Sequence, residues 1–277
     1  FYIQVDYHAP HGDKDPPAGP QPATRDIATV RRTALPERNS IINKNKNYNE
    51  QNTRDKPFVL QDTNGPITED NIVKLRNSYR TAISSLQSVD DGLAYLHKTL
   101  KETGELKNTY IIFTSDNGFF YGDHRFITGK TLAYQEASHL PFVVSGPGVP
   151  KHKVSRRASS VVDVAPTVLQ LARVPRGNLR LDGSSMKPGW KHPKAKKNRV
   201  QLIEYLSYKD LDGDHNQPGP EEHALDPYRP ASKPPNVRYA AVKIGPYKYV
   251  EYNQGGSELY DLRRDPNELY NQTDNTG

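Results

Sequence analysis

Cysteine is absent from this chain of 277 residues. The chain therefore has no disulfide bond, no thiolate ligand for a metal ion and no thiol nucleophile of its own. Long apolar stretches are absent as well, since none reaches the roughly 18 residues that a membrane-spanning helix requires. The first ten residues, FYIQVDYHAP, have neither the basic leader nor the cleavage pattern of a signal peptide. We accordingly expect no membrane span, while the compartment of the protein stays open.

Hydrophobic side chains make up only 34% of the sequence, which also contains 23 prolines and 19 glycines. A compact core must therefore share the chain with long polar connections. The net charge of +6 comes mostly from scattered basic residues, with one dense run, KHPKAKKNR, at residues 191–199. Such a run is more typical of a solvated loop than of an anion-binding patch, and we expect no nucleic-acid partner.

The most regular helical pattern follows Thr68, a residue suited to cap the start of a helix. Apolar side chains then recur at steps of three or four, which is the stripe of an amphipathic helix. Gly104 is placed to end this helix, and Gly92 could bend or divide it. The stripe consists of Ile72, Leu75, Tyr79, Ile83, Leu86, Val89, Leu93, Leu96 and Leu100.

Short apolar runs on both sides of this helix predict an open α/β sheet. Residues 1–7 alternate like a strand, and residues 109–115 and 141–146 are continuously apolar, as expected of parallel strands covered on both faces. A further short helix is predicted at residues 163–174. The sequence thus indicates a mostly parallel sheet with helices on both faces.

Two long polar segments interrupt this pattern, at about residues 12–66 and 209–236. Neither has an apolar period, so each is a functional loop or a partly disordered insertion. We predict an α/β core over residues 1–190. Residues 191–277 contain four short runs of alternating apolar side chains, VQLIEYLSY, VRYAAVKIG, YKYVEY and SELYDL, and are predicted to form a small antiparallel subdomain.

Chemically useful side chains concentrate in residues 114–130, TSDNGFFYGDHRFITGK, directly after an apolar run. Ligands of open α/β sheets bind beyond the carboxyl ends of the strands, where this loop should lie. Asp116 and Asn117 together suit a hard cation, Ca²⁺ or Mg²⁺. An Asp-Asn-Gly turn chosen for its backbone is the alternative, and two ligands are too few for a closed metal site.

Four basic side chains could act on an anion bound near this loop. Lys130 would supply a fixed positive charge, and His124 a proton donor or an orienting group. His8 and His11, in the motif HAPH, follow the first predicted strand and would reach the same edge of the sheet if the strands are parallel. Without a further nitrogen or sulfur ligand they do not make a zinc site.

Several motifs, in this order, resemble the type I sulfatases of the alkaline phosphatase superfamily. They are HAPH, TGELKNTYIIFTSDNGFFYGDHR followed by GK, PFVVSGPGV, SSVVDVAPTVLQLARV and ELYDLRRDPNE. Within the family the resemblance is to arylsulfatases and N-acetylglucosamine-6-sulfatases. It covers most of the chain outside the two polar segments, and it implies an alkaline phosphatase-like fold.

The resemblance also implies roles for individual residues. Asp116 and Asn117 match the second half of the family's Ca²⁺ site, and Lys130 matches the lysine that holds a sulfate oxygen. His11 matches the histidine that contacts the sulfate and protonates the departing alcohol. His8 and His124 would support these groups. Cleaving a sulfate ester requires such neutralisation of charge and protonation of the alkoxide.

Two parts of the family's active site have no match in this chain. The family's nucleophile is a formylglycine made from Cys or Ser in the motif C/S-x-P-S/A-R, and the Ca²⁺ site begins with paired aspartates near the N-terminus. Asp90 and Asp91 are not that pair, because they fall within the long predicted helix. We therefore expect a C-terminal portion of a sulfatase, inactive alone and completed by an N-terminal portion.

Three functions stay open on these residues. The first is a sulfuric ester hydrolase acting on a sulfated small molecule or a sulfated glycan. The second is a phosphate or phosphonate ester hydrolase of the same superfamily. The third is a non-catalytic fragment that binds sulfated glycans through Lys130 and residues 191–199. A secreted, periplasmic or lysosomal location would agree with the resemblance.

Overall fold

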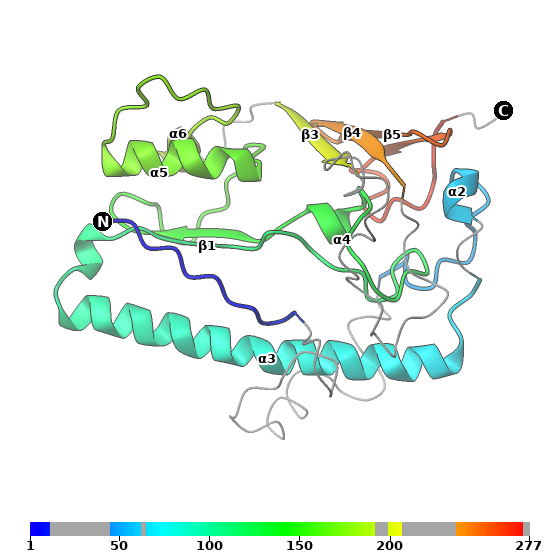
Figure 1. The fold of residues 1–277 in the computed structure, drawn as a ribbon, viewed down its shortest axis with the longest axis horizontal. Coiled ribbons are helices and arrows are strands. Elements are labelled where there is room, and N and C mark those ends of the chain that lie inside the picture. Colours follow the sequence, from blue (N-terminus) through cyan, green and yellow to red (C-terminus); the bar gives the residue numbers. More distant parts are fainter. Residues whose placement is uncertain (12–44, 62–64, 192–198, 207–236, 274–277) are drawn as a thin grey trace, which may run out of the picture.

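The computed structural model describes residues 1–11, 45–61, 65–191, 199–206 and 237–273 (Figure 1). Most of the two predicted polar segments, and most of the basic run at 191–199, lie outside these residues. In Figure 1 a long helix, α3, lies on one side of strand β1, and helix α5 lies on the other. No helix in the described residues is long and apolar enough to cross a membrane.

Helix α3, Glu69–Glu102, is the predicted amphipathic helix, and it is confirmed. The side chain of Thr68 caps it by accepting a hydrogen bond from the backbone nitrogen of Asn71 (3.4 Å), and Gly104, with φ of 78°, follows its end. Gly92 does not divide the helix. A Cβ at Gly92 would lie 2.0 Å from the hydroxyl of Tyr7, so the missing side chain lets the N-terminal segment approach the helix.

Strands β1, Ile111–Thr114, and β2, Phe142–Ser145, form a two-stranded sheet. Both strands were predicted, but the prediction that they run parallel is wrong, because they pair antiparallel. Their connection contains only the four-residue helix α4, Gln135–Ser138, and brings the chain back at the end of the sheet where β1 stopped. A parallel neighbour would have needed a crossover to the opposite end.

Residues 1–7 run beside α3 in an extended path, but they form no strand. The prediction of a strand there is wrong for the described structure, because a strand requires a hydrogen-bonded neighbour and the alternating pattern cannot supply one. In Figure 1 this segment runs in the same direction as β1.

A second group of helices lies beyond β2. Helix α5, Val164–Ala172, confirms the helix predicted at 163–174. The buried carboxylate of Asp163 precedes it and accepts from the backbone nitrogens of Ser160 (3.0 Å) and Ser184 (2.7 Å). The remaining helices are short: α2 Phe58–Gln61, η2 Leu106–Asn108, η3 Val161–Asp163 and α6 Lys187–Lys191.

The predicted C-terminal antiparallel strands are confirmed. They form one sheet in the order β3-β4-β5-β6, with bounds Val200–Tyr205, Tyr239–Ile244, Tyr247–Tyr252 and Ser257–Asp261. Alternate side chains of β5 are buried, as the pleat of a one-sided sheet requires. The division at residue 190 stays a prediction.

The main hydrophobic core joins this sheet to the loop that follows β1. Phe120, Phe126, Leu132 and Tyr134 come from the loop region, and Val250 is one of the sheet residues that they meet. The loop with the predicted site residues is therefore anchored on the C-terminal sheet. The other sheet-side members are Val237, Tyr239, Ala241, Tyr252 and Tyr260.

Candidate active site

Residues 115–130, called the site loop below, leave β1 and fold back on themselves. The backbone nitrogen of Phe120 donates to the carbonyl oxygen of Gly129 (3.0 Å), and that of Gly122 donates to the carbonyl oxygen of Phe126 (2.8 Å). Nearer the base, the nitrogen of Gly118 donates to Ala137 (2.9 Å). Residues 120 and 129 of the site loop therefore lie side by side, with residues 123–125 at its tip.

Asp116 and Asn117 lie at the start of the site loop, where Asp116 is exposed and Asn117 is half-buried. Asp116 Oδ1 accepts from the backbone nitrogen of Asn117 (2.9 Å), and Asn117 Nδ2 donates to the carbonyl of Gly118 (2.8 Å). Within the described residues no donor bonds Asp116 Oδ2 or Asn117 Oδ1. Two such oxygens fit the chemistry of Ca²⁺, which takes six to eight oxygen ligands.

These two residues cannot enclose a calcium ion alone. Across the ranges that the structure describes, no three His, Asp or Glu side chains converge in a way that could hold a metal. Asp116 and Asn117 therefore offer part of a metal site, as the sequence indicated. Their assignment to Ca²⁺ stays a prediction.

Lys130 ends the site loop and is half-buried. It follows Gly129, whose carbonyl receives the hydrogen bond from Phe120. In the described part of the chain no carboxylate pairs with its ammonium group, so its charge can be offered to an anion. Its role with sulfate stays a prediction.

His8 and His11 are exposed at the end of the N-terminal segment. A tight turn joins them: the backbone nitrogen of His11 donates to the carbonyl of His8 (2.8 Å), and the ring centroids are 5.0 Å apart. The turn contains a cis peptide bond between Ala9 and Pro10. The structure thus brings the two imidazoles together, and their catalytic roles stay predictions.

His124 differs from the other predicted residues because it is buried, with 3% of its surface exposed. Its Nδ1 lies 2.7 Å from Oε2 of Glu50, and its Nε2 lies 3.3 Å from Nδ2 of Asn47. Its ring stacks on Tyr134 at 3.9 Å. Burial lowers the pKa of His124 to about 4, although Glu136 nearby acts in the opposite direction. The imidazole is consequently neutral at neutral pH.

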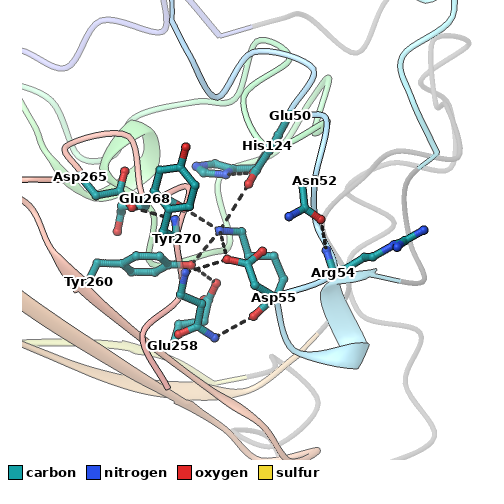
Figure 2. A network of polar contacts seen from close by, with 12 residues as sticks. Glu50, Asn52, Arg54, Asp55, His124, Glu258, Tyr260, Asp265, Glu268 and Tyr270 are labelled. Carbon is teal, nitrogen blue, oxygen red and sulfur yellow. Dashed lines mark hydrogen bonds and ion pairs between the residues drawn. The ribbon is translucent and has the colours of Figure 1, made fainter. Parts of the chain in front are cut away.

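Glu50 contacts both His124, as Figure 2 shows, and the buried Lys56. Lys56 Nζ donates to the carbonyl of Glu268 (2.7 Å) and to the hydroxyl of Tyr260 (3.1 Å), and it lies 3.4 Å from Oε1 of Glu50. Burial raises the pKa of Glu50 to about 7, with the charge of Lys56 opposing this shift. Figure 2 shows Glu50 and His124 meeting at one side of the network and Tyr260 and Glu268 at the other.

The residues after the site loop are held by the C-terminal sheet. Lys248 is buried, pairs with Glu268 and donates to the carbonyl of Ala133 (2.6 Å). Glu268 also accepts from the backbone nitrogen of Gln135 (2.7 Å). Glu258 accepts hydrogen bonds of 2.6 Å from the hydroxyls of Tyr134, Tyr252 and Tyr260.

Sequence reasoning missed Asn47, Glu50 and Lys56, because they fall in a segment that looked like a polar insertion. Hydropathy gives no signal for such residues, since a paired buried charge has the same sequence signature as a solvated one. Only their partners, which are distant in the sequence, identify them as buried.

The likeness to the solved structures reported below confirms the predicted alkaline phosphatase-like α/β fold class with a small C-terminal antiparallel sheet, whereas the predicted parallel pairing of β1 with β2 stays wrong. Residues 1–174, more than half of the chain, match the family model described as Sulfatase. The chain therefore belongs to the sulfatase family, and the predicted resemblance is confirmed.

Similar proteins agree with this assignment. An arylsulfatase of Volvox carteri is 31% identical over 315 residues, covering 99% of this chain and 45% of that protein. The human N-acetylglucosamine-6-sulfatase is 34% identical over 161 residues, covering 56% of this chain and 29% of that protein. The chain thus spans less than half the length of these relatives.

Two solved structures share the fold. One was determined in complex with its substrate, D-glucosamine-2-N,6-O-disulfate; it has a TM-score of 0.58 and 27% identity, covering 76% of this chain and 39% of that one. The other is a phosphonate monoester hydrolase of Agrobacterium radiobacter, with a TM-score of 0.54, 26% identity and the same two coverages.

Proposed function

We propose that this chain forms part of an enzyme that hydrolyses a sulfate ester. The observation that carries the proposal is the fold of the site loop. The hydrogen bond between Phe120 and Gly129 folds the loop back, so that Lys130 follows directly on a residue paired with the half of the loop that begins with the oxygen donors Asp116 and Asn117. Membership of the sulfatase family supports the same reaction.

Each of these groups has a task in our proposal. Asp116 and Asn117 would hold Ca²⁺ through Oδ2 and Oδ1, and the ion would supply positive charge against the sulfate oxygens. Lys130 binds a further sulfate oxygen and neutralises charge that spreads over the group during cleavage. These interactions favour the transition state because its charge is more dispersed towards the oxygens and the leaving alkoxide.

Proton transfer to the leaving alcohol falls to the histidines of the N-terminal segment. His11 donates a proton to the departing alkoxide, and His8, whose ring is 5.0 Å away, helps to orient it. The attack on sulfur is supplied by a formylglycine that we place outside this chain. We accordingly expect the chain to be inactive until an N-terminal sulfatase portion completes the site.

A sulfated sugar is the substrate class that we favour over other sulfate esters. One structural neighbour with 27% identity binds a sulfated glucosamine as its substrate. The same groups would also serve another sulfated small molecule, since in our proposal they meet only the sulfate group and the leaving oxygen.

The proposal can be tested by comparing the product of the complete gene with this chain alone. We expect the first to release sulfate from p-nitrophenyl sulfate and from glucosamine 6-sulfate, and the second to release none. Chelation with EGTA should abolish the activity, and Asp116→Asn should reduce it by at least about 100-fold, since a metal ligand is lost. Asp90→Asn, on the exposed face of α3, is the control and should have no effect. A complete, folded protein that cleaves neither ester would contradict the proposal.

A second candidate is hydrolysis of phosphate or phosphonate esters. The likeness to a phosphonate monoester hydrolase favours it. That chemistry with two metal ions would require more His and Asp ligands than the pair Asp116 and Asn117. Activity on phenyl phosphonates exceeding that on p-nitrophenyl sulfate would establish this alternative.

A further inference from the structure

The tip of the site loop is attached to residues 45–56, called the brace below. The backbone nitrogen of His124 donates to the carbonyl of Asn47 (2.8 Å), and the nitrogen of Asn49 donates to the carbonyl of Gly122 (2.8 Å). Arg125 adds a hydrogen bond from Nε to the carbonyl of Glu50 (2.6 Å). The backbone of the brace thus bonds the tip on both sides, through two backbone groups of the tip and the side chain of Arg125.

The backbone of the tip requires such support. His124 and Arg125 have φ of 51° and 66°, in the left-handed region that L-residues with side chains disfavour. Two consecutive residues in this region do not persist unless the surroundings over-determine them. The bonds from the brace and the side chain of His124 supply this constraint.

The side chain of His124 fits its neighbours in one hydrogen-bonding pattern. Asn47 Nδ2 donates to Oε1 of Glu136 (2.8 Å), which orients the amide so that the same nitrogen also faces Nε2 of His124. Nε2 therefore accepts, and Nδ1 carries the proton and donates to Glu50 (2.7 Å). The imidazole acts here as one donor and one acceptor between fixed partners.

Lys56 links Glu50 to the C-terminal sheet. Lys56 lies 3.4 Å from Glu50 and donates to Tyr260 of strand β6 and to the carbonyl of Glu268. All of these groups are buried. A continuous line of polar contacts therefore runs from the sheet through the brace to the tip of the site loop.

We propose that His124 is a positioning residue of the sulfatase site, which acts through Glu50 and Lys56 to fix the tip of the site loop and thereby the spacing between Asn117 and Lys130 at its base. The buried position and the fixed partners leave the imidazole no route to a leaving group. This inference rests on the proposed function, and it assigns His124 to orientation instead of proton transfer.

The enzymatic test uses the product of the complete gene with substitutions of His124. Glutamine can donate to Glu50 and accept from Asn47, as the neutral imidazole does, whereas alanine can do neither. We expect His124→Ala to lower kcat/KM for p-nitrophenyl sulfate by about 10- to 100-fold, as a displaced site does. His124→Gln should recover most of this loss, and both variants should keep the two limbs of the wild-type pH profile. His97→Gln, at an exposed position of α3, is the matched control.

A proton donor would give the opposite result. If His124→Gln were as inactive as His124→Ala and either variant lost one limb of the pH profile, the inference would be wrong. Unchanged kcat/KM in His124→Ala would overturn it as well.

A second variant serves if His124→Ala does not fold. Arg125→Met removes two hydrogen bonds to the brace, to the carbonyls of Glu50 and Gln51, and leaves every partner of the imidazole in place. We expect Arg125→Met to lower kcat/KM for p-nitrophenyl sulfate and to leave both limbs of the pH profile unchanged. Wild-type kcat/KM in Arg125→Met would contradict positioning by the brace.

Hydrogen exchange separates this inference from the proposed function. The amides of Phe120, Gly122 and His124 are bonded within the site loop or to the brace, and their exchange should quicken in His124→Ala but not in His124→Gln or His97→Gln. Unaltered exchange would refute the inference while sulfatase activity stood. A wild-type protein without sulfatase activity would refute the proposed function, and the exchange rates would still decide whether His124 fixes the loop.

Discussion

Burial controls the ionisation of His124 and Glu50. The pKa of His124 falls from 6.5 to about 4, and that of Glu50 rises from 4.5 to about 7, in both cases because burial disfavours the charged form. The two side chains share a contact of 2.7 Å. Between pH 4.5 and 6.5 the unfolded pair carries a proton on histidine and the folded pair retains one on glutamate, so folding changes the number of bound protons little.

The opposed shifts predict different pH dependences for the single variants. In Glu50→Gln only His124 remains, and because its folded pKa is depressed, the free energy of unfolding should rise with pH from about 4 to 6.5. In His124→Gln only Glu50 remains, and because its folded pKa is raised, stability present below pH 4.5 should be lost as the pH rises to about 7. Each change should be on the order of 1 to 3 kcal/mol, and that of the wild type smaller. Urea unfolding at several pH values between 4 and 7 measures this dependence. The same change of unfolding free energy with pH in the wild type and both variants would contradict the prediction.

Lys130, unlike His124 and Glu50, is only half-buried, and no carboxylate of the described residues pairs with it. Lys130→Ala should therefore change the free energy of unfolding by less than about 0.5 kcal/mol. In the complete protein it should lower kcat/KM for p-nitrophenyl sulfate by about 100-fold, because a fixed charge against the sulfate is lost. Lys151→Ala, exposed in the connection after β2, is the control. Equal effects of the two substitutions on kcat/KM would remove Lys130 from the site.

At the scale of elements, helix α3 and the N-terminal segment meet at Gly92. A Cβ there would lie 2.0 Å from the hydroxyl of Tyr7, at the end of a side chain that can move. The helix itself would gain from an alanine, because glycine is less favourable in a helix interior by about 0.8 to 1 kcal/mol. In the Gly92→Ala variant the clash with Tyr7 and the gain in helix propensity would therefore act on stability in opposite directions.

A double substitution separates them. Gly92→Ala alone should displace Tyr7 and increase proteolytic cleavage within residues 1–11, with little gain in stability. In a Tyr7→Ala background, Gly92→Ala should raise the free energy of unfolding by about 0.5 to 1 kcal/mol, since the clash is gone. Urea unfolding of the wild type, the two single variants and the double variant measures the coupling energy between residues 7 and 92. An equal effect of Gly92→Ala in both backgrounds would show that Tyr7 does not occupy this position.

Elements with a local pattern could be predicted from the sequence. Helix α3 follows from an apolar stripe of period 3.6, and strands β4, β5 and β6 follow from alternation and a short turn. The direction of β2 relative to β1 could not be predicted in this way. It depends on the course of the connection between them, where the site loop turns back and α4 is too short to cross the sheet.

At the scale of the whole molecule, Lys56 connects the brace to the C-terminal sheet. Its ammonium lies within 3.4 Å of Glu50, Tyr260 and the carbonyl of Glu268. Removing one partner from a buried ion pair leaves an uncompensated charge, which costs about 3 to 5 kcal/mol. Lys56→Met should destabilise the protein by this order in urea unfolding. Lys46→Met, exposed in the same segment, should change stability by less than about 0.5 kcal/mol. Similar effects of both substitutions would exclude a central role for Lys56.

The position of the candidate site residues in the fold could be predicted in part, and for a physical reason, whereas their functions stay predictions. Asp116, Asn117 and Lys130 follow an apolar strand, and polar groups in that position face solvent at the edge of a sheet. His124 looked equivalent to them in the sequence, but it lies in the core. Glu50 and Lys56 could not be predicted, because charged side chains are buried only when partners are supplied from elsewhere.

The sequence by itself determined the local elements and the family, and it predicted which side chains would meet a metal ion and a sulfate group. Tertiary structure alone decided which of these side chains reach the solvent. Glu50 lies 74 residues from His124, and Lys56 lies 204 residues from Tyr260. Desolvation and pairing depend on neighbours in space, so the ionisation of His124 is decided only when the brace and the C-terminal sheet close around it.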